Sequence, residues 1–166
     1  MLLNPQDKLP MKILFICTHN RCRSILAEAV TNHCSDGQLI AKSAGSQPVG
    51  EVHPLSLQYL TEANISTDTL CSQSWHDHES WQADVVITVC DSAAGETCPV
   101  WFGKSIKVHW GLVDPSRLEG SDDEIADAFR NTLAILQSRI KKLLSHDLDK
   151  MSREELTVTF KALGEN

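Results

Sequence analysis

The chain has 166 residues, which suits one domain, and its hydrophobic content of 42% and charged content of 22% are ordinary for a globular protein. The formal net charge of −7 argues against nucleic acid and anionic membranes as partners, because neither would meet an obvious basic face. No stretch reaches the ~18 apolar residues of a membrane span, and residues 1–10 lack the apolar core of a signal peptide. We therefore expect a cytoplasmic protein whose six cysteines are reduced, catalytic or redox-active rather than structural.

Predicted strands and helices alternate in the first half of the chain. The apolar run at residues 12–16 predicts a buried parallel strand, and residues 24–30 predict the start of a helix. A short second strand is predicted at residues 38–43. Helical spacing, with a proline in the first turn, then predicts a helix near residues 53–62.

The second half continues the same pattern. Residues 84–89 are β-branched and apolar and form the clearest predicted strand, and residues 105–110 predict a fourth. Residues 122–144 have the periodicity of a long amphipathic helix, with a serine before it as a cap. Residues 152–155 are typical of a capping box that opens a short tail helix.

This order of elements predicts an α/β fold, a four-stranded parallel sheet with helices on both faces. We expect a flexible leader at residues 1–10, one domain at residues 11–145 and a C-terminal tail at residues 146–166. Parallel sheets bind ligands in the loops at the carboxyl ends of their strands. The segment CTHNRCRS, Cys17 to Ser24, occupies such a position after the first strand.

This segment has the composition of an oxyanion site. A loop from a strand into a helix turns backbone N–H groups inward, so residues 18–23 (Thr18, His19, Asn20, Arg21, Cys22 and Arg23) are predicted to bind a tetrahedral oxyanion. The guanidinium of Arg23 matches two oxygens of such an anion, and Ser24 can hydrogen-bond the Cys17 thiolate. The predicted chemistry is in-line attack by Cys17; the alternative is a small buried hydrophobic residue at a strand end.

The stretch ICTHNRCRSILAEA resembles the low-molecular-weight protein tyrosine phosphatase family, and particularly its arsenate reductase branch. The resemblance covers roughly residues 11–143 and is also strong in VVITVCDSAAGETCPVW (residues 85–101) and HWGLVDPS (residues 109–116). It implies the flavodoxin-like fold of low-molecular-weight phosphatases. It also implies that Asp114 of the Asp-Pro dipeptide is the general acid, although that dipeptide alone is a turn signal.

Two further features favour the reductase branch. The phosphatase branch typically places tyrosines after the Asp-Pro dipeptide, whereas Ser116 and Arg117 follow it here and the only tyrosine is Tyr59. Cys90 and Cys98 match the two additional cysteines of the redox branch. Their C-x7-C spacing is not that of a zinc knuckle, and two unrelated thiols are the alternative.

The resemblance implies a cysteine relay for arsenic detoxification. Cys17 attacks arsenate, Cys90 attacks Cys17 and releases arsenite, and Cys98 attacks Cys90 to leave an exported disulfide. The implied reductant is thioredoxin, with glutaredoxin and glutathione as second choice, and no cofactor is bound tightly. Phosphate or sulfate would compete with arsenate. We expect a monomer without nucleic acid or membrane partners.

Two other functions remain open at this point. A low-molecular-weight protein tyrosine phosphatase would hydrolyse phosphate monoesters with the same loop. A redox-responsive binding module would react once through its thiols and dock a partner, but Asp114 would have no purpose in it. Multiple turnover separates both enzymes from the binding module.

Some family members bind potassium beside the loop, through the matches of Asn20, Glu28 and Ser43. That site is doubtful here, because Cys71 and Gln73 stand where oxygen ligands are expected. We expect His19 and Arg21 to face solvent and the run HDHE (residues 76–79) to be a solvated loop. Cys22 can tune the site without taking part in the relay, and Cys34 and Cys71 are expected bystanders.

Overall fold

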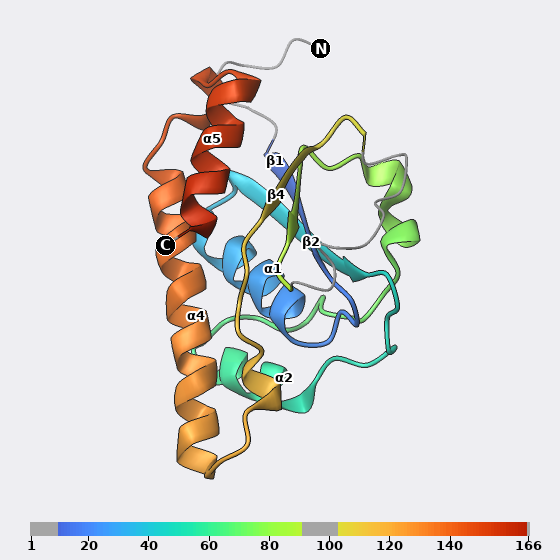
Figure 1. The fold of residues 1–166 in the computed structure, drawn as a ribbon, viewed down its shortest axis with the longest axis vertical. Coiled ribbons are helices and arrows are strands. Elements are labelled where there is room, and N and C mark those ends of the chain that lie inside the picture. Colours follow the sequence, from blue (N-terminus) through green and yellow to red (C-terminus); the bar gives the residue numbers. More distant parts are fainter. Residues whose placement is uncertain (1–9, 91–102, 166) are drawn as a thin grey trace.

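The computed structural model describes residues 10–90 and 103–165 (Figure 1). Its four strands form one parallel sheet, as the sequence predicted, and their order is β2-β1-β3-β4. The strands are β1 (Met11–Cys17), β2 (Leu39–Gly45), β3 (Val85–Thr88) and β4 (Ile106–His109). The leader expected at residues 1–10 lies outside the described residues, apart from Pro10.

Helices follow or connect these strands. The α-helices are α1 (Arg23–Cys34), α2 (Pro54–Glu62), α4 (Asp122–Leu144) and α5 (Arg153–Gly164), and the 3-10 helices are η1 (Trp75–Trp81), η3 (Pro115–Arg117) and η4 (Leu148–Lys150). Helices α1 and α5 pack against the sheet, α4 packs against both of these helices, and η1 packs on β2 (Figure 1). Lys42 lies over the Trp81 ring of η1, while its neighbour Ser43 bonds Glu28 of α1, so both faces of the sheet are covered.

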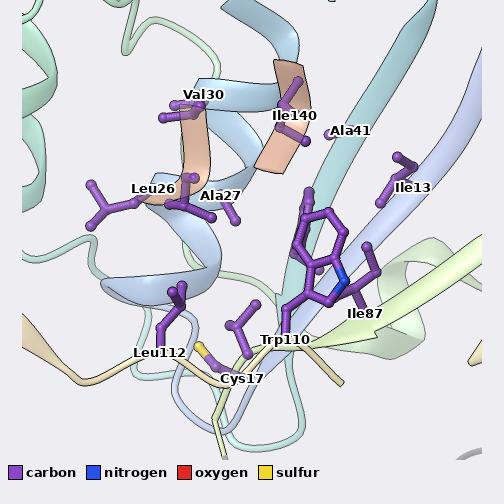
Figure 2. Packing of buried hydrophobic residues seen from close by; sticks show 14 of the residues in the cluster. Ile13, Cys17, Leu26, Ala27, Val30, Ala41, Ile87, Trp110, Leu112 and Ile140 are labelled. Atoms are coloured by element: carbon purple, nitrogen blue, oxygen red, sulfur yellow. The ribbon is translucent and has the colours of Figure 1, made fainter. Parts of the chain in front are cut away.

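The core lies between the sheet and the helices α1 and α4. Residues 13–17 of β1 are all buried, as expected of a central parallel strand with both faces covered. Figure 2 shows Cys17 at the border of this apolar cluster, beside Leu112. Burial of each large apolar side chain contributes about 1.5–3 kcal/mol, so β1 holds the loop that follows it on a rigid base.

The ends of helix α4 were predicted closely. The helix begins after Ser121, whose side chain accepts from the backbone N–H of Glu124. The Glu124 carboxylate in turn accepts from the backbone N–H of Ser121. This reciprocal capping box satisfies two donors at the start of the helix. Within the two described ranges, no helix is long and apolar enough to cross a membrane.

Helix α5 covers the edge strand β4. Trp110 is fully buried, stacks on Phe160 and donates its Nε1–H to the Phe160 carbonyl at 2.7 Å. A Cβ on Gly164 would lie 2.4 Å from the His109 carbonyl oxygen, so the helix requires glycine where it approaches the strand. An uncovered edge strand is prone to pair with other chains, and α5 removes that hazard.

The run HDHE was predicted correctly only in part: His76, Asp77 and Glu79 are exposed, but the run is not a loop and His78 is buried. It belongs to the 3-10 helix η1, which Ser74 caps, and His78 is only 6% exposed. Nε2 of His78 lies 3.1 Å from the Ser43 carbonyl oxygen, so this ring is part of the packing on β2. The polar residues of this run predicted exposure to solvent, because the sequence alone does not reveal that the segment lies against a strand 35 residues away.

Candidate active site

The predicted oxyanion loop joins β1 to α1. Cys17 is the last residue of β1, and Arg23 is the first of α1. Cys22 stands at the N-cap position without a side-chain cap, so the first N–H groups of the helix are available to an anion. The loop borders a cavity of about 270 Å³ lined by Cys17, Thr18, His19, Arg21, Cys22, Arg23, Cys90, Asp114 and Arg117.

Asn20 holds the loop from inside. It is fully buried with a φ of 48°, a left-handed conformation that asparagine tolerates better than most residues. Its Oδ1 accepts from the Gln73 N–H at 2.8 Å, and its Nδ2 donates to Ser24 Oγ at 2.8 Å and to Ser43 Oγ at 3.0 Å. The side chain thus ties the loop to helix α1 and to strand β2.

These contacts fix the direction of the hydrogen bond at the nucleophile. Because Ser24 Oγ accepts from Asn20, its own proton can go to Cys17 Sγ, which lies 2.9 Å away. A hydroxyl that donates to sulfur stabilises the thiolate. The Cys17 side chain is 5% exposed, so an attacking sulfur would lie at the floor of the cavity.

The same chain of hydrogen bonds ends at a buried carboxyl. Ser43 donates to Glu28 Oε1 at 2.6 Å, and Glu28 is 5% exposed. Burial raises the pKa of Glu28 from 4.5 to about 7, while the contacts with Ser43 and Lys42 oppose the shift. Glu28 therefore changes charge near neutral pH.

This raised pKa predicts a pH-dependent stability. The folded chain binds the Glu28 proton more tightly than the unfolded chain does, so the stability from this group is full below pH 4.5 and is lost as pH rises through about 7. We expect Glu28→Gln to gain unfolding free energy relative to the parent protein in that window, by up to about 1.4 kcal/mol per pH unit. Urea titrations of both proteins from pH 4.5 to 8 measure the difference; a difference that is flat with pH would contradict the prediction.

The arrangement of Asn20, Glu28 and Ser43 does not fit a potassium ion. Potassium is held by several oxygens directed at one point. Here Asn20 Oδ1 accepts a backbone N–H, and Ser43 Oγ gives its proton to Glu28. Cys71, at an expected ligand position, is exposed, and the described residues contain no cluster of three metal-ligating His, Cys, Asp or Glu side chains. The three residues hold the loop, and no step of the chemistry is assigned to an ion.

Gly45 at the end of β2 lets the loop approach the sheet. A Cβ there would lie 2.5 Å from the Thr18 carbonyl oxygen and 3.1 Å from the Asn20 backbone nitrogen. We expect Gly45→Ala to displace the loop, to cost about 1–3 kcal/mol of stability and to weaken oxyanion binding at least ~10-fold. Thermal unfolding and phosphate inhibition constants measure both effects. Gly120→Ala is the control, because its Cβ would meet only the flexible Glu124 carboxyl end; equal losses in both variants would refute this role of Gly45.

Asp114 lines the same cavity as the loop. It caps the 3-10 helix η3: its Oδ1 accepts from the Ser116 N–H at 2.9 Å and from the Ser116 hydroxyl at 2.6 Å. Its Oδ2 lies 3.7 Å from Arg23 Nη2 and 3.5 Å from Arg117 Nε. Arg23 also donates to the Leu112 carbonyl at 3.0 Å, so the loop arginine and the carboxyl are held on one wall.

Two other thiols border the cavity. Cys22 is 2% exposed, and burial raises the pKa of its thiol to about 12, so it stays protonated and a poor nucleophile. Cys90, just past β3, is 3% exposed, and its Sγ lies 3.7 Å from Thr18 Oγ1. The segment after β3 is thus anchored beside the loop, where Val89 N–H also bonds the Ile16 carbonyl.

The family model of low molecular weight phosphotyrosine protein phosphatases matches residues 12–155. The chain belongs to this family. An arsenate reductase of Halalkalibacterium halodurans is 33% identical over 129 residues, which are 78% of this chain and 91% of the relative.

Solved structures agree with that assignment. An arsenate reductase in the phosphate-binding state superposes with a TM-score of 0.63 at 26% identity, over 81% of this chain and 97% of that one. The thioredoxin-dependent arsenate reductase of Corynebacterium glutamicum gives a TM-score of 0.59 at 30% identity, over 84% of this chain and 65% of that longer one.

Several residues of this low molecular weight phosphatase family site were not predicted from the sequence to contribute to the loop or its cavity. His19 and Arg21 were predicted as part of the oxyanion loop, but their side chains were expected to face solvent; both are half-buried and line the cavity. Arg117 lines it as well. Gly45 and Gln73 support the loop from other segments of the chain. Of these two residues, only Gly45 could be expected beside the loop from the order of the strands, because it pairs with Cys17 in the sheet.

The remaining cysteines divide as follows. Cys34 is half-buried and Cys71 exposed, and neither lines the cavity. Cys98, predicted as the last member of the relay, lies outside the described residues.

Proposed function

We propose that this protein is an arsenate reductase that works by a cysteine relay. The observation that carries the proposal is that Cys90 lines one cavity with Cys17, Arg23 and Asp114, in addition to Cys22, whose thiol stays protonated. A phosphatase needs one thiol, one arginine and one acid, and has no use for a second buried thiol beside the loop. The arsenate reductases among its relatives and structural neighbours support the same activity.

The first step is formation of a thiol adduct. Arsenate occupies the loop against the N–H groups and Arg23, and the Cys17 thiolate attacks arsenic in line with the leaving oxygen. Asp114 supplies a proton, so the oxygen leaves as water. Ser24, which donates to Cys17, stabilises the thiolate before the attack and loses that role as the S–As bond forms.

The second step reduces arsenic. The Cys90 thiolate attacks Cys17 Sγ, an S–S bond forms, and the electron pair of the broken S–As bond stays on arsenic, which leaves as arsenite. Cys98 then attacks Cys90 and returns Cys17 as a thiolate. Two thiols become one disulfide, and arsenate loses one oxygen as water.

Thioredoxin is the proposed reductant of the Cys90–Cys98 disulfide, since a structural neighbour of 30% identity is thioredoxin-dependent. Glutaredoxin with glutathione is the second choice. The chain would act as a cytoplasmic monomer without a tightly bound cofactor. We assign the chemistry to residues 11–145; the segment expected as a tail, residues 146–166, instead contributes Phe160 and Leu163 of α5 to the core.

The cavity wall disfavours phosphotyrosine. None of its described lining residues is a tyrosine, tryptophan or phenylalanine, and Ser116 and Arg117 follow Pro115. An aromatic ester would therefore lack a ring to stack on. The loop can still hydrolyse simple phosphate esters, since a phosphorylated Cys17 cannot be reduced and can only react with water.

A single-turnover experiment tests the proposal. The reduced protein is mixed with excess arsenate and no reductant, and arsenic species and disulfides are analysed. We expect about one arsenite per chain and a disulfide that joins the peptides of Cys90 and Cys98. Arsenite formation without that disulfide would refute the relay, and no arsenite at all would leave the phosphatase as the better function.

A further inference from the structure

We propose that the mouth of the active-site cavity is a second anion subsite, formed by Arg21 and Arg117. It would bind a carboxylate or phosphate on the leaving group of a phosphate ester whose phosphoryl group sits in the loop. The further activity is hydrolysis of small phosphate esters that carry a second anionic group. This activity goes beyond arsenate reduction and does not depend on it.

The cavity has a deep end and a shallow end. Its floor is formed by Cys17 and Cys22, which are 5% and 2% exposed. The Arg23 side chain is 21% exposed, whereas that of Arg117 is 74% exposed. Arg23 therefore serves an anion on the floor, and Arg117 serves the mouth.

The cavity is larger than one oxyanion needs. A tetrahedral anion with four oxygens takes the place of about four water molecules, or roughly 120 Å³ at ~30 Å³ each. The cavity holds about 270 Å³. Space therefore remains for the rest of a ligand, which would extend from the loop towards the mouth.

The charges on this cavity are unbalanced. Its described lining carries the guanidinium groups of Arg21, Arg23 and Arg117 against the single carboxyl of Asp114. Arg23 and Arg117 both approach that carboxyl. Around Arg21, no carboxylate of residues 10–90 or 103–165 lies within ion-pair distance.

The backbone of Arg21 is held in place. Its carbonyl oxygen accepts from the His53 N–H at 2.9 Å and from Ser56 Oγ at 3.4 Å. Beside it, His19 Nδ1 is buried without a hydrogen-bond partner in the described structure. A planar guanidinium matches both carboxylate and phosphate, so a half-buried arginine that lines the cavity and has no carboxylate beside it is suited to an anionic ligand.

The hydrolysis balances without an oxidant. The Cys17 thiolate forms an S–P bond, the bond from phosphorus to the ester oxygen breaks, and that oxygen takes a proton from Asp114. Water then attacks phosphorus and gives a proton back to Asp114. The S–P bond breaks, and inorganic phosphate and the thiolate are restored. Arg21 and Arg117 hold the anionic leaving group during the first step.

The test compares two esters that differ in one group. 3-Phosphoglycerate carries a carboxylate where glycerol 3-phosphate carries a hydroxymethyl group. Calorimetry measures their dissociation constants on a Cys17→Ser background, which cannot turn over, and phosphate release measures their hydrolysis by the active chain. We expect the carboxylate to improve binding about tenfold and kcat/KM to follow. Pyrophosphate as a third ligand shows whether a phosphate fills the subsite as well.

Variants then locate the preference. On the same background, Arg21→Gln and Arg117→Gln are each expected to reduce the ratio of the two constants to about twofold. Arg153→Gln removes one charge outside this cavity and should keep the tenfold ratio. The proposal would be overturned if the two esters bind equally, if neither binds, or if no phosphate is released. It would also be overturned if Arg153→Gln causes the same loss of preference. Arsenate turnover is measured separately, so none of these outcomes bears on the reductase.

Discussion

Replacement of Cys17 by serine is expected to abolish arsenate reduction and phosphate ester hydrolysis together, by at least ~10³-fold in kcat. Both reactions begin with attack by the same sulfur, and a serine hydroxyl at this position has no base to activate it. The loop itself should survive, because Asn20 is tied to Ser24, Ser43 and Gln73 without using the sulfur. Phosphate should therefore still bind.

The measurement is arsenite formation and p-nitrophenol release by the variant, with phosphate binding followed by calorimetry. Cys71→Ser is the matched control, since Cys71 is exposed and lies away from the cavity. Retention of either activity by Cys17→Ser would show that another residue is the nucleophile. A loss of activity in Cys71→Ser would point to a general effect of thiol removal.

Replacement of Cys90 is expected to separate the two activities. Cys90→Ser should stop sustained arsenate turnover by at least ~10²-fold, because no thiol remains to take the Cys17–arsenic adduct apart. Hydrolysis of p-nitrophenyl phosphate should stay within about twofold, because water resolves that intermediate. Cys98→Ser should give the same pattern under multiple turnover.

Steady-state rates of the two reactions on one preparation measure the separation. Cys34→Ser serves as control for loss of a half-buried thiol outside the cavity. A Cys90→Ser variant that keeps full multiple-turnover reduction would refute the relay. One that loses both activities would assign Cys90 to the loop structure instead, through its contact with Thr18.

Local patterns in the sequence predicted well the strand and helices that position the site. The apolar run of β1 predicted a strand covered on both faces, and the helix expected from residue 24 begins at Arg23, one residue earlier. The long helix α4 was predicted from Asp122 to Leu144 because both its cap and its apolar stripe are local features. Where a signal and its structural cause lie within a few residues, sequence is sufficient.

Contacts between distant segments could not be predicted. Asn20 and Gln73 are separated by 53 residues, and nothing local shows that one accepts a hydrogen bond from the other. His78 was expected in solvent because its neighbours are polar, yet the fold buries it on β2. Arg21 was misplaced for a similar reason, since the path of the loop around the left-handed Asn20 decides which side chains reach the cavity.

The most direct test of the central claim is arsenate-dependent oxidation of NADPH in the presence of thioredoxin and thioredoxin reductase. The account predicts sustained consumption of NADPH that requires arsenate and yields one arsenite for each NADPH oxidised. Consumption only with glutaredoxin and glutathione would change the reductant and keep the relay. No consumption with either system would contradict the assignment as an arsenate reductase.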